Sequence, residues 1–398
     1  MKKETKIVTK GRNPFIHGGS VNTPIFTTST VLYPTRESYL QADRGEPYFE
    51  ESKMGDTLDF SYGTGGTPTT YALQEALRDL ENGDACALTS SGLSAITNTL
   101  NALVETGDHI LVVDTVYGPT RRYCNFNLKK NGVEIEYYDP RIGSDIINLI
   151  KDNTKLIFME SPGSLTFEVQ DVESITKIAK EKNIYTILDN SWSTPLFFNP
   201  IDHGVDIVIQ AVTKFIGGHS DLLLGAIITK GDEISRKILK GVRNSGSTPN
   251  PFSCYLALRG LRSLSARMER HQKSTSYIIP KIQEHPRVKK ILYPALENSA
   301  DYEIWKKQFS GAASLFTIIL DRRYSDDELS NLMDNFSIFG IGASWGGFES
   351  LVLDFDPRSI RTAVKWSDEC SCVRFYIGLE NQEDLLQDLI VGLDRLNG

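Results

Sequence analysis

Three polar positions that could share one chemical task follow apolar runs of the kind that form buried strands. Asp189 ends the run YTILD, and Lys214 lies three residues after the run DIVIQA. Gly92 opens a helical pattern shortly after the run ACALT. In open α/β sheets ligands bind beyond the carboxyl ends of the strands, so these three positions are expected to lie near one another.

The three positions match the needs of one cofactor. The first turn of a helix favours a phosphate, because free N–H groups and the helix dipole both attract negative charge; Gly92 and Leu93 would supply it. Lys214 at a strand end can become a Schiff-base amine if its surroundings lower its pKa. Asp189 can keep a pyridinium nitrogen protonated, which makes the ring an electron sink. Together they describe a pyridoxal 5′-phosphate (PLP) site, although each alone is more often a turn, cap or solvated residue.

From about residue 65, strand-like and helical patterns alternate regularly, and these elements must position the three residues. Short apolar runs without strict alternation are separated by helical patterns such as LSAITNTLNALVE and VESITKIAKEKN. This order predicts an α/β fold with a mostly parallel central sheet covered by helices on both faces.

The pattern changes twice along the chain. Residues 1–64 are rich in Thr, Ser, Pro and Gly and are predicted to form an extended arm. Residues 65–260 are predicted to form the PLP-binding domain, and a helical stretch from about 251 to 284 follows its last apolar run. Residues 261–398 are predicted to form a smaller C-terminal α+β domain.

Composition narrows the class of protein. The 398 residues include 43 Lys and Arg against 51 Asp and Glu, a net charge of −8 that argues against nucleic-acid and anionic-membrane binding. No apolar run approaches the ~20 residues of a membrane span, and no signal peptide is recognisable. Five cysteines, an odd number, fit reduced thiols, so a cytoplasmic enzyme is expected.

Longer motifs make the chain recognisable. It resembles the Cys/Met-metabolism PLP enzymes of fold type I over nearly its whole length. The resemblance is carried by YGTGGTPTTYALQEALRDLE (62–81), TSSGLSAI (89–96), DTVYGP (114–119), FMESPGS (158–164), ILDNSW (187–192), QAVTKFIGGHSD (210–221) and FYIGLE (375–380). Within the family it is most similar to bacterial cystathionine β-lyases, because Ser164-Leu165 stands where γ-acting members have Asn-Pro and because Ser-Trp-Gly-Gly occurs at 344–347.

The resemblance implies roles around the cofactor. Lys214 would bind it as a Schiff base and move the Cα proton, and Asp189 would pair with the ring nitrogen. Tyr117 would stack on the ring, or else be a tyrosine at the core rim. The phosphate would be bound by residues after two strands, namely Ser91, Gly92, Leu93 and Thr213.

The resemblance also implies roles for the substrate and for a second subunit. Arg374 would bind the α-carboxylate as a bidentate fork, unless it is a buried ion-pair residue. Trp345, with Ser344 beside it, would line the pocket for the distal part of the substrate, or else fill a domain interface. Tyr62 would act in the site of a neighbouring subunit, which implies a homo-oligomer, expected as a tetramer of two site-sharing dimers.

One position departs from the family pattern. The family usually has Tyr-x-Arg, whose arginine binds the PLP phosphate of the neighbouring subunit, but Thr64 stands there, followed by Gly65. The partner's phosphate contact is therefore in doubt. Arg44 or Lys53 could fill the gap.

The resulting expectation is a PLP-dependent C–S lyase that cleaves L-cystathionine to homocysteine, pyruvate and ammonia. A γ-acting family member and a catalytically silent PLP-fold binding protein are the alternatives, and alanine racemisation is available to the same carbanion. No metal is expected: Cys370 and Cys372 lack a partner pair. The adjacent residues of His219-Ser220-Asp221 cannot converge as a hydrolytic triad.

Overall fold

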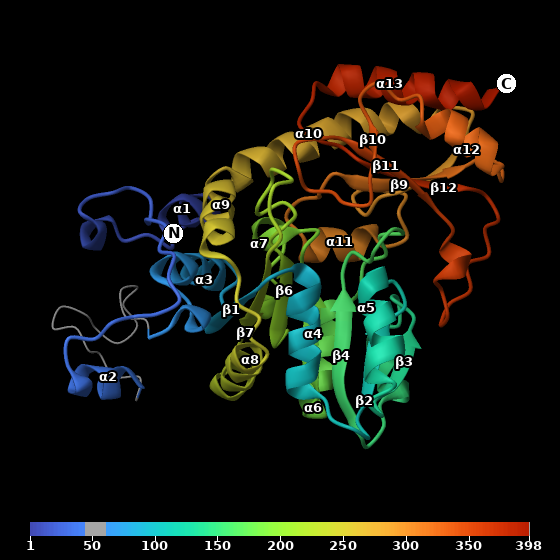
Figure 1. The fold of residues 1–398 in the computed structure, drawn as a ribbon. Coiled ribbons are helices and arrows are strands. Elements are labelled where there is room, and N and C mark those ends of the chain that lie inside the picture. The colour runs from blue at the N-terminus through green and yellow to red at the C-terminus, as the bar shows by residue number, and fades with distance from the viewer. Residues whose placement is uncertain (44–60, 398) are drawn as a thin grey trace.

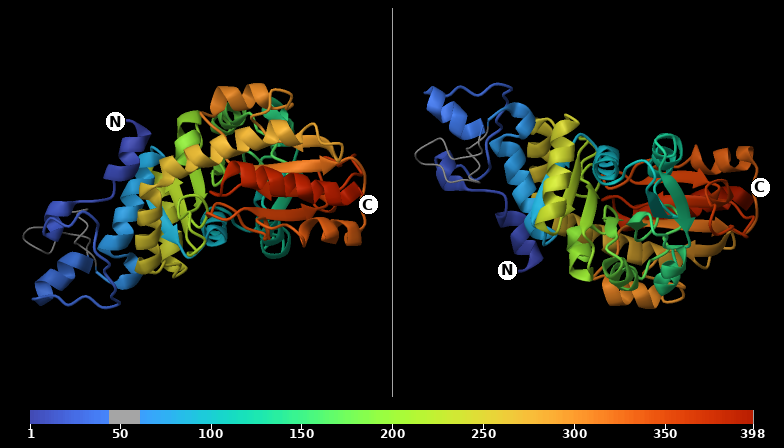
Figure 2. Two further views of the ribbon diagram at one scale, coloured as in Figure 1. Left: turned by 90° about the horizontal axis from the view of Figure 1, so that it is seen from above. Right: turned by 90° about the horizontal axis from the view of Figure 1, so that it is seen from below.

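Two β-sheets with flanking helices make up most of the chain. A computed structural model describes residues 1–43 and 61–397. The larger sheet has seven strands in the order β1-β7-β6-β5-β4-β2-β3, and the smaller has five in the order β10-β11-β12-β9-β8. In Figure 1 the smaller sheet lies above the larger one, and the N-terminal segment extends to the side. Figure 2 shows the two termini far apart, with the C-terminus at the end of the molecule opposite the N-terminal segment.

The larger sheet and its helices come from the middle of the chain. Its strands are β1 (Ala85–Thr89), β2 (His109–Val113), β3 (Glu134–Tyr138), β4 (Thr154–Glu160), β5 (Tyr185–Asp189), β6 (Ile207–Ala211) and β7 (Gly225–Thr229). Its helices are α3 (Pro68–Leu80), α4 (Gly92–Leu103), α5 (Gly118–Tyr123), α6 (Val172–Glu181), α7 (Thr194–Phe197) and α8 (Asp232–Asn244).

The smaller sheet follows two consecutive helices, α9 (Pro251–Arg262) and α10 (Leu264–Ile282). Its strands are β8 (Val288–Leu292), β9 (Leu315–Leu320), β10 (Gly340–Ile341), β11 (Leu351–Phe355) and β12 (Cys372–Tyr376). Its helices are α11 (Tyr302–Gln308), α12 (Asp326–Met333) and α13 (Gln382–Asp394).

The predicted α/β fold with a mostly parallel sheet is confirmed. Neighbours β3, β2, β4, β5 and β6 pair in parallel, and only β7 runs antiparallel, between β6 and β1. The runs ACALT and YTILD are the strands β1 and β5 without any change of bounds. Strand β7 begins only at Gly225, because Leu224 before it pairs with the backbone and side chain of Thr213.

The N-terminal prediction was too simple. The segment contains α1 (Lys3–Thr9) and α2 (Arg36–Asp43) instead of being extended throughout. Ile7 of α1 is buried, and Arg262 of α9 donates to the carbonyls of Ile7 and Lys10. Part of the arm is therefore packed against its own chain.

The helical stretch predicted from 251 to 284 is two helices that meet at Ser263. The proposed boundary after residue 260 falls inside α9, so a helix leads from one sheet to the other. None of the helices in residues 1–43 and 61–397 combines the length and the hydropathy that crossing a bilayer requires.

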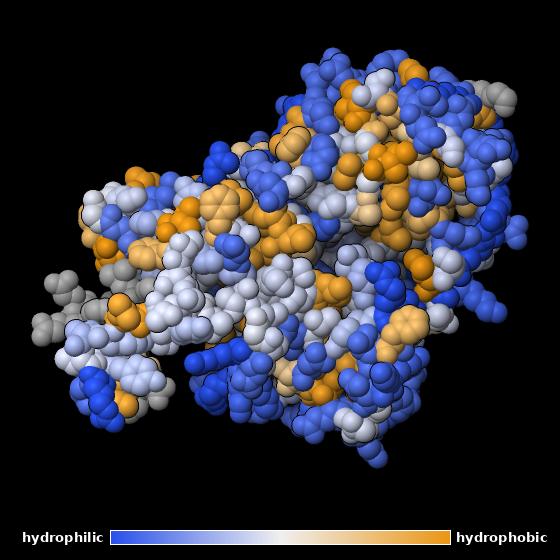
Figure 3. Space-filling model, viewed as in Figure 1, coloured by the Kyte–Doolittle hydropathy of each residue, from blue (hydrophilic) through white to orange (hydrophobic). Residues whose placement is uncertain are grey.

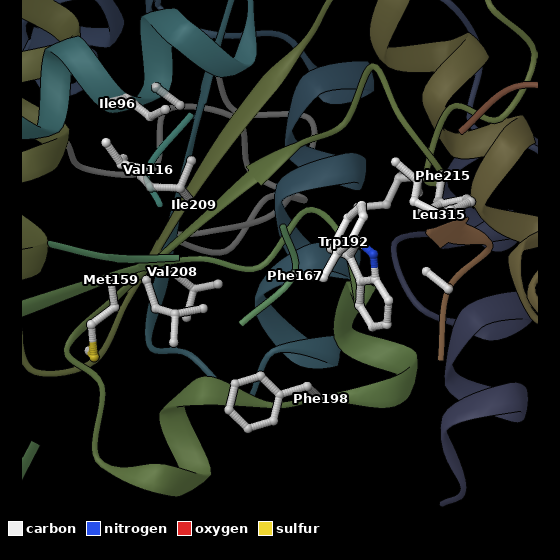
Figure 4. Close-up of a cluster of buried hydrophobic side chains, with 14 of the residues drawn as sticks. Ile96, Val116, Met159, Phe167, Trp192, Phe198, Val208, Ile209, Phe215 and Leu315 are labelled. Carbon is white, nitrogen blue, oxygen red and sulfur yellow. The ribbon is translucent and has the colours of Figure 1, made fainter. Parts of the chain in front are cut away.

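A buried apolar cluster connects the two sheets. Figure 4 shows Phe215, which follows β6, close to Leu315, which opens β9, with Trp192 and Phe167 beside them. All four side chains are nearly inaccessible to solvent. Burial of this kind contributes about 25 cal/mol per Å² of apolar surface, so the cluster fixes one sheet against the other.

Candidate active site

A cavity of about 360 Å³ lies at the carboxyl ends of the central strands. It is lined by most of the residues predicted for the site: Ser91, Gly92, Leu93, Tyr117, Asp189, Thr213, Lys214, Trp345 and Arg374. The structure thus brings together residues from both sheets that are up to 283 positions apart in the chain (374 − 91). The structure shows that these residues lie close together, and the role of each of them remains a prediction.

Lys214 is placed in the cavity by a turn after β6, in which its N–H donates to the carbonyl of Ala211. Its Nζ donates to the Ser344 hydroxyl at 2.6 Å and lies 5.1 Å from the centre of the Trp345 ring. Burial, and then the charge of Arg374, lower the pKa of Lys214 to about 8, against the opposing effect of Asp189. A neutral, nucleophilic amine is therefore within reach near neutral pH.

Asp189 is the last residue of β5 and is only 9% exposed. Its Oδ1 accepts from both the N–H and the hydroxyl of Ser191, at 3.0 and 2.6 Å. The Ser191 hydroxyl in turn accepts from the N–H of Ala211, so β6 orients the carboxylate as well. Burial raises the pKa of Asp189, while its hydrogen bonds to Ser191 and the charge of Lys214 act in the other direction.

Helix α4 points its N-terminus at the cavity. Ser91 caps it, accepting from the N–H of Ser94 at 3.0 Å, and the first N–H groups of any helix lack intrahelical partners. Gly92 lies so close to β6 that a Cβ there would come within 2.8 Å of the Ala211 Cβ. This close approach brings the free N–H groups of Gly92 and Leu93 beside the Lys214 strand end.

Thr213 lines the cavity, but its hydroxyl is already engaged. It donates to the carbonyl of Leu224 and accepts from the N–H of Leu224, at 3.2 and 3.0 Å. The predicted donation to a phosphate would require the hydroxyl to give up its bond to that carbonyl.

Tyr117 precedes α5 and is 42% exposed, whereas residues 114–116 just before it are buried. Its N–H donates to the Glu160 carboxyl at 2.7 Å. Burial, followed by the charges of Asp189 and Glu160, raises the pKa of the Tyr117 phenol. The ring is therefore both open to the cavity and held in its protonated form.

Arg374 enters from the middle strand of the smaller sheet and is 4% exposed. Its guanidinium donates to the carbonyls of Gly342, Ala343 and Ser344, at 2.8, 3.2 and 3.1 Å. Its Nε has no partner, and no salt bridge to it occurs within the described ranges. The interpretation of Arg374 as a buried ion-pair residue is thus not supported by its contacts, and the buried Nε–H is a donor without a partner in the described chain.

Ser344 and Trp345 lie on the segment between β10 and β11. Trp345 packs on Phe215 with 5.4 Å between ring centres, so it contacts both the cavity and the interface between the sheets. Gly346 has φ +91°, and a Cβ there would lie 2.7 Å from the backbone of Lys214 and Phe215. Only glycine allows the segment to approach the Lys214 turn this closely.

Tyr62 does not reach the cavity of its own chain. It is 50% exposed and forms an isolated bridge with Thr30 of the N-terminal segment. Thr64 lines a separate recess with Arg243. Arg44 and Lys53, proposed as replacements for the missing arginine, lie outside the described residues.

Sequence reasoning overlooked Glu160, Ser164 and Trp192, which also line the cavity. Glu160 ends β4 as Asp189 ends β5, so the strand-end rule that selected Asp189 could also have found it. Ser164 and Trp192 lie in loops, and the sequence carries no comparable signal for them.

The residues present fit PLP. The donor set contains an amine, a carboxylate for a ring cation, and a helix N-terminus for a phosphate. No cluster of three or more His, Cys, Asp or Glu side chains suited to a metal occurs in the part of the chain that the structure describes.

Comparison with known proteins gives one family. The sequence model of the Cys/Met metabolism PLP-dependent enzymes matches residues 4–394. An L-alanine/L-glutamate racemase of Wolbachia pipientis is 45% identical over 100% of this chain and 98% of the relative. A cystathionine β-lyase of Escherichia coli is 35% identical over 99% of both.

A solved structure supports the same grouping. The cystathionine γ-synthase from Xanthomonas oryzae pv. oryzae, in complex with aminoacrylate and cysteine, superposes with a TM-score of 0.88 and 27% identity, covering 100% of this chain and 99% of the other.

Proposed function

This chain belongs to the Cys/Met metabolism PLP-dependent enzymes, and from that premise we propose that it is a C–S lyase acting on L-cystathionine. The observation that carries the proposal is the Lys214 amine, which lies in one cavity with Asp189 and Arg374. The similarity to a cystathionine β-lyase along nearly the whole chain supports the choice of substrate.

In this proposal, each of the residues that line the cavity has a separate role in the reaction. Arg374 binds the α-carboxylate, for which its Nε is free. PLP, when bound, supplies an electron sink for the pair left at Cα after deprotonation. Lys214 Nζ removes the Cα proton, which a pKa of about 8 allows near neutral pH. Tyr117, held protonated, donates to the departing sulfur. The Cβ–S bond breaks and homocysteine leaves; the remaining three-carbon fragment is released as aminoacrylate, which water hydrolyses to pyruvate and ammonia.

The distal part of the substrate lies against Trp345 in this proposal. A second hollow adjoins the cavity there, lined by Ser344, Trp345 and Glu349 among others. Thr213, Leu223 and Trp345 line both spaces, so the two hollows are neighbours.

Amino-acid racemisation is the second candidate, favoured by the 45% identity to an L-alanine/L-glutamate racemase. It begins with the same removal of the Cα proton by Lys214. It differs in that the proton returns to the opposite face and no bond to sulfur breaks. A γ-acting enzyme remains a further alternative, in view of the likeness to a γ-synthase.

One set of assays separates these functions. The purified holoenzyme is given L-cystathionine, and the keto acid is identified; L-alanine and L-glutamate are given separately, and their enantiomers are resolved. Pyruvate supports the β-lyase, 2-oxobutyrate a γ-acting enzyme, and D-amino acids without keto acid the racemase. No reaction with any of them, although amino acids shift the absorbance of bound PLP, indicates a silent binding protein.

A homo-oligomer, expected as a tetramer, is part of the proposal, and a cytoplasmic location stays a prediction. The N-terminal segment exposes large apolar side chains, among them Phe15 at 92% and Leu32 at 86%, and Figure 3 shows hydrophobic residues on the surface of this region. Tyr62 also lies outside its own cavity. Mixing inactive Lys214→Ala and Tyr62→Ala chains should restore activity if Tyr62 serves a neighbour's site, and sedimentation gives the number of subunits.

A further inference from the structure

Two buried carboxyl groups share one wall of the cavity. Glu160 and Asp189 are the last residues of β4 and β5 and are register partners in the parallel pair. They are 8% and 9% exposed, and both line the cavity. Neighbouring strands lie about 4.8 Å apart, so two negative charges at these positions would repel each other strongly.

The surrounding charges favour ionisation of Asp189 over Glu160. The charged and titratable groups around the pair are Lys214 after β6 and Tyr117 before α5, with Arg122 acting on Tyr117 and Arg374 of β12 acting on Lys214. Burial raises the pKa of Asp189 as well, but the charge of Lys214 and the hydrogen bonds from Ser191 oppose this. Burial and the neighbouring Asp189 raise the pKa of Glu160 to about 8. Within the described residues no salt bridge reaches Glu160.

A neutral Glu160 can keep its hydrogen bonds, although those donated by Ser164 and by the N–H of Tyr117 lower its pKa against the effects of burial and Asp189. Its Oε2 accepts from the N–H of Tyr117 at 2.7 Å, and its Oε1 lies in a short contact with the Ser164 hydroxyl. A proton on Oε1 would be donated to Ser164 Oγ, and the hydrogen of Ser164 could then point into the cavity that Ser164 lines. An ionised Glu160 would instead accept the hydrogen bond from the Ser164 hydroxyl, which could then not donate into the cavity.

We propose that Glu160 is a positioning residue that works as a neutral bridge: it fixes the backbone of Tyr117, aims the Ser164 hydroxyl as a donor into the cavity, and leaves Asp189 as the only carboxylate that meets the cofactor ring. The proposal rests on the PLP site of the family. It does not depend on whether the reaction is an elimination or a racemisation.

The first test compares variants of Glu160 by their affinity for PLP. Gln keeps an acceptor for Tyr117 and a donor for Ser164, so Glu160→Gln should hold PLP within about threefold of wild type. Glu160→Asp keeps the acid but is too short for both contacts, and Glu160→Ala removes them. Both should weaken PLP binding about tenfold or more. Glu105→Gln, on the exposed turn after α4, is the matched control and should change nothing.

The measurement is equilibrium dialysis of the full-length holoenzyme against a competing amine, with the visible circular dichroism of bound PLP as a report on Tyr117 stacking. A merely structural carboxylate would show the reverse order, with Asp better tolerated than Gln. That result would overturn the proposal.

The second test detects the proton itself. The infrared spectrum of the PLP-bound protein near neutral pH should contain a protonated-carboxyl stretch that disappears in Glu160→Gln. The difference between the two spectra is required, because the buried Glu81, whose pKa burial raises to about 7, contributes a similar band. A difference spectrum without this band shows an ionised Glu160 and refutes the neutral bridge, even if the lyase assay succeeds.

Discussion

The two walls of the cavity are built in different ways. The sheet wall consists of Glu160, Asp189, Lys214 and the start of α4, all at strand ends of the larger sheet. The loop wall consists of the segment 342–347 and Arg374, which belong to the smaller sheet. In the sheet wall, carboxyl side chains are bonded to serine hydroxyls and backbone N–H groups in the strand-end turns. In the loop wall, the arginine is bonded to backbone carbonyls of residues 342–344, of which 343 and 344 are exposed.

The two walls are assigned different tasks, one to bind the cofactor and the other to bind the substrate. The groups assigned to the cofactor are fixed by adjoining parallel strands, whose ends cannot move independently because the strands pair along their length. The groups assigned to the substrate lie on a segment between β10, a strand of two residues, and β11. We infer that the sheet wall determines which bond to Cα is weakened, while the loop wall determines which amino acid is held there.

The largest expected effect tests the sheet wall. Lys214→Ala should lower turnover by about three orders of magnitude or more, because both the Schiff base and the carrier of the Cα proton are lost. The visible absorbance of lysine-bound PLP should vanish as well. Lys240→Ala, at an exposed lysine of α8, is the control. Substantial activity in the Lys214 variant would remove the basis for assigning the chemistry to this wall.

The next effect tests the loop wall. Arg374→Ala should weaken amino-acid binding by about 2–4 kcal/mol, or roughly 30- to 700-fold, because a charged fork is lost from a largely dry pocket. Arg374→Lys should recover only part of it, since an ammonium cannot reproduce the fork. The titration follows the spectral shift of bound PLP, with the surface variant Arg358→Ala for comparison. Normal binding in both Arg374 variants would mean that the arginine only supports the segment 342–344.

A smaller effect concerns the phosphate end of the sheet wall. The start of α4 offers N–H groups but no charged side chain, and Thr64 replaces the arginine that the family resemblance implies for the neighbouring subunit. A charged hydrogen bond contributes about 1.5–3 kcal/mol, so Thr64→Arg should tighten PLP binding roughly 10- to 150-fold. Release of PLP on dialysis against an amine measures this, with Thr5→Arg as the control. Unchanged release would mean that another basic residue already supplies the charge.

The smallest expected effect is on the pKa of Lys214 in the sheet wall, which the charge of Arg374 in the loop wall lowers. The pKa of about 8 for Lys214 predicts that cofactor-free protein captures PLP faster as pH rises, levelling off above about 8, because only the neutral amine attacks. Arg374 lowers this pKa, so Arg374→Ala should move the midpoint upward. Stopped-flow absorbance over a range of pH gives both midpoints. A midpoint near the 10.5 of an ordinary lysine would show that Lys214 is solvated.

The sheet wall was easier to predict from the sequence than the loop wall. The strands ending in Thr89 and Asp189 could be read from their apolar runs, because buried parallel strands are continuously apolar and stop at polar residues. Glu160 followed the same rule and was overlooked. The carbonyl contacts of Arg374 depend on how the smaller sheet packs, which no local pattern encodes, so the choice of Arg374 and Trp345 came from the family resemblance alone.

The short helix α1 was missed for a related reason. Its seven residues carry one buried side chain, Ile7, which is too little for a periodic pattern. The helix exists through its contacts with α3 and α9, where Arg262 binds the carbonyls of Ile7 and Lys10. Isolated helices of this length are unstable in water, so tertiary contacts decide whether they form.

The three carbonyl contacts of Arg374 affect how the substrate preference of such a site can change in evolution. The three acceptors, from Gly342, Ala343 and Ser344, are main-chain atoms that every residue type possesses. Mutations at the two exposed positions, 343 and 344, can therefore exchange the side chains beside the substrate while the arginine keeps its anchors. Selection can act on substrate preference one substitution at a time there, without first passing through variants that have lost the carboxylate fork.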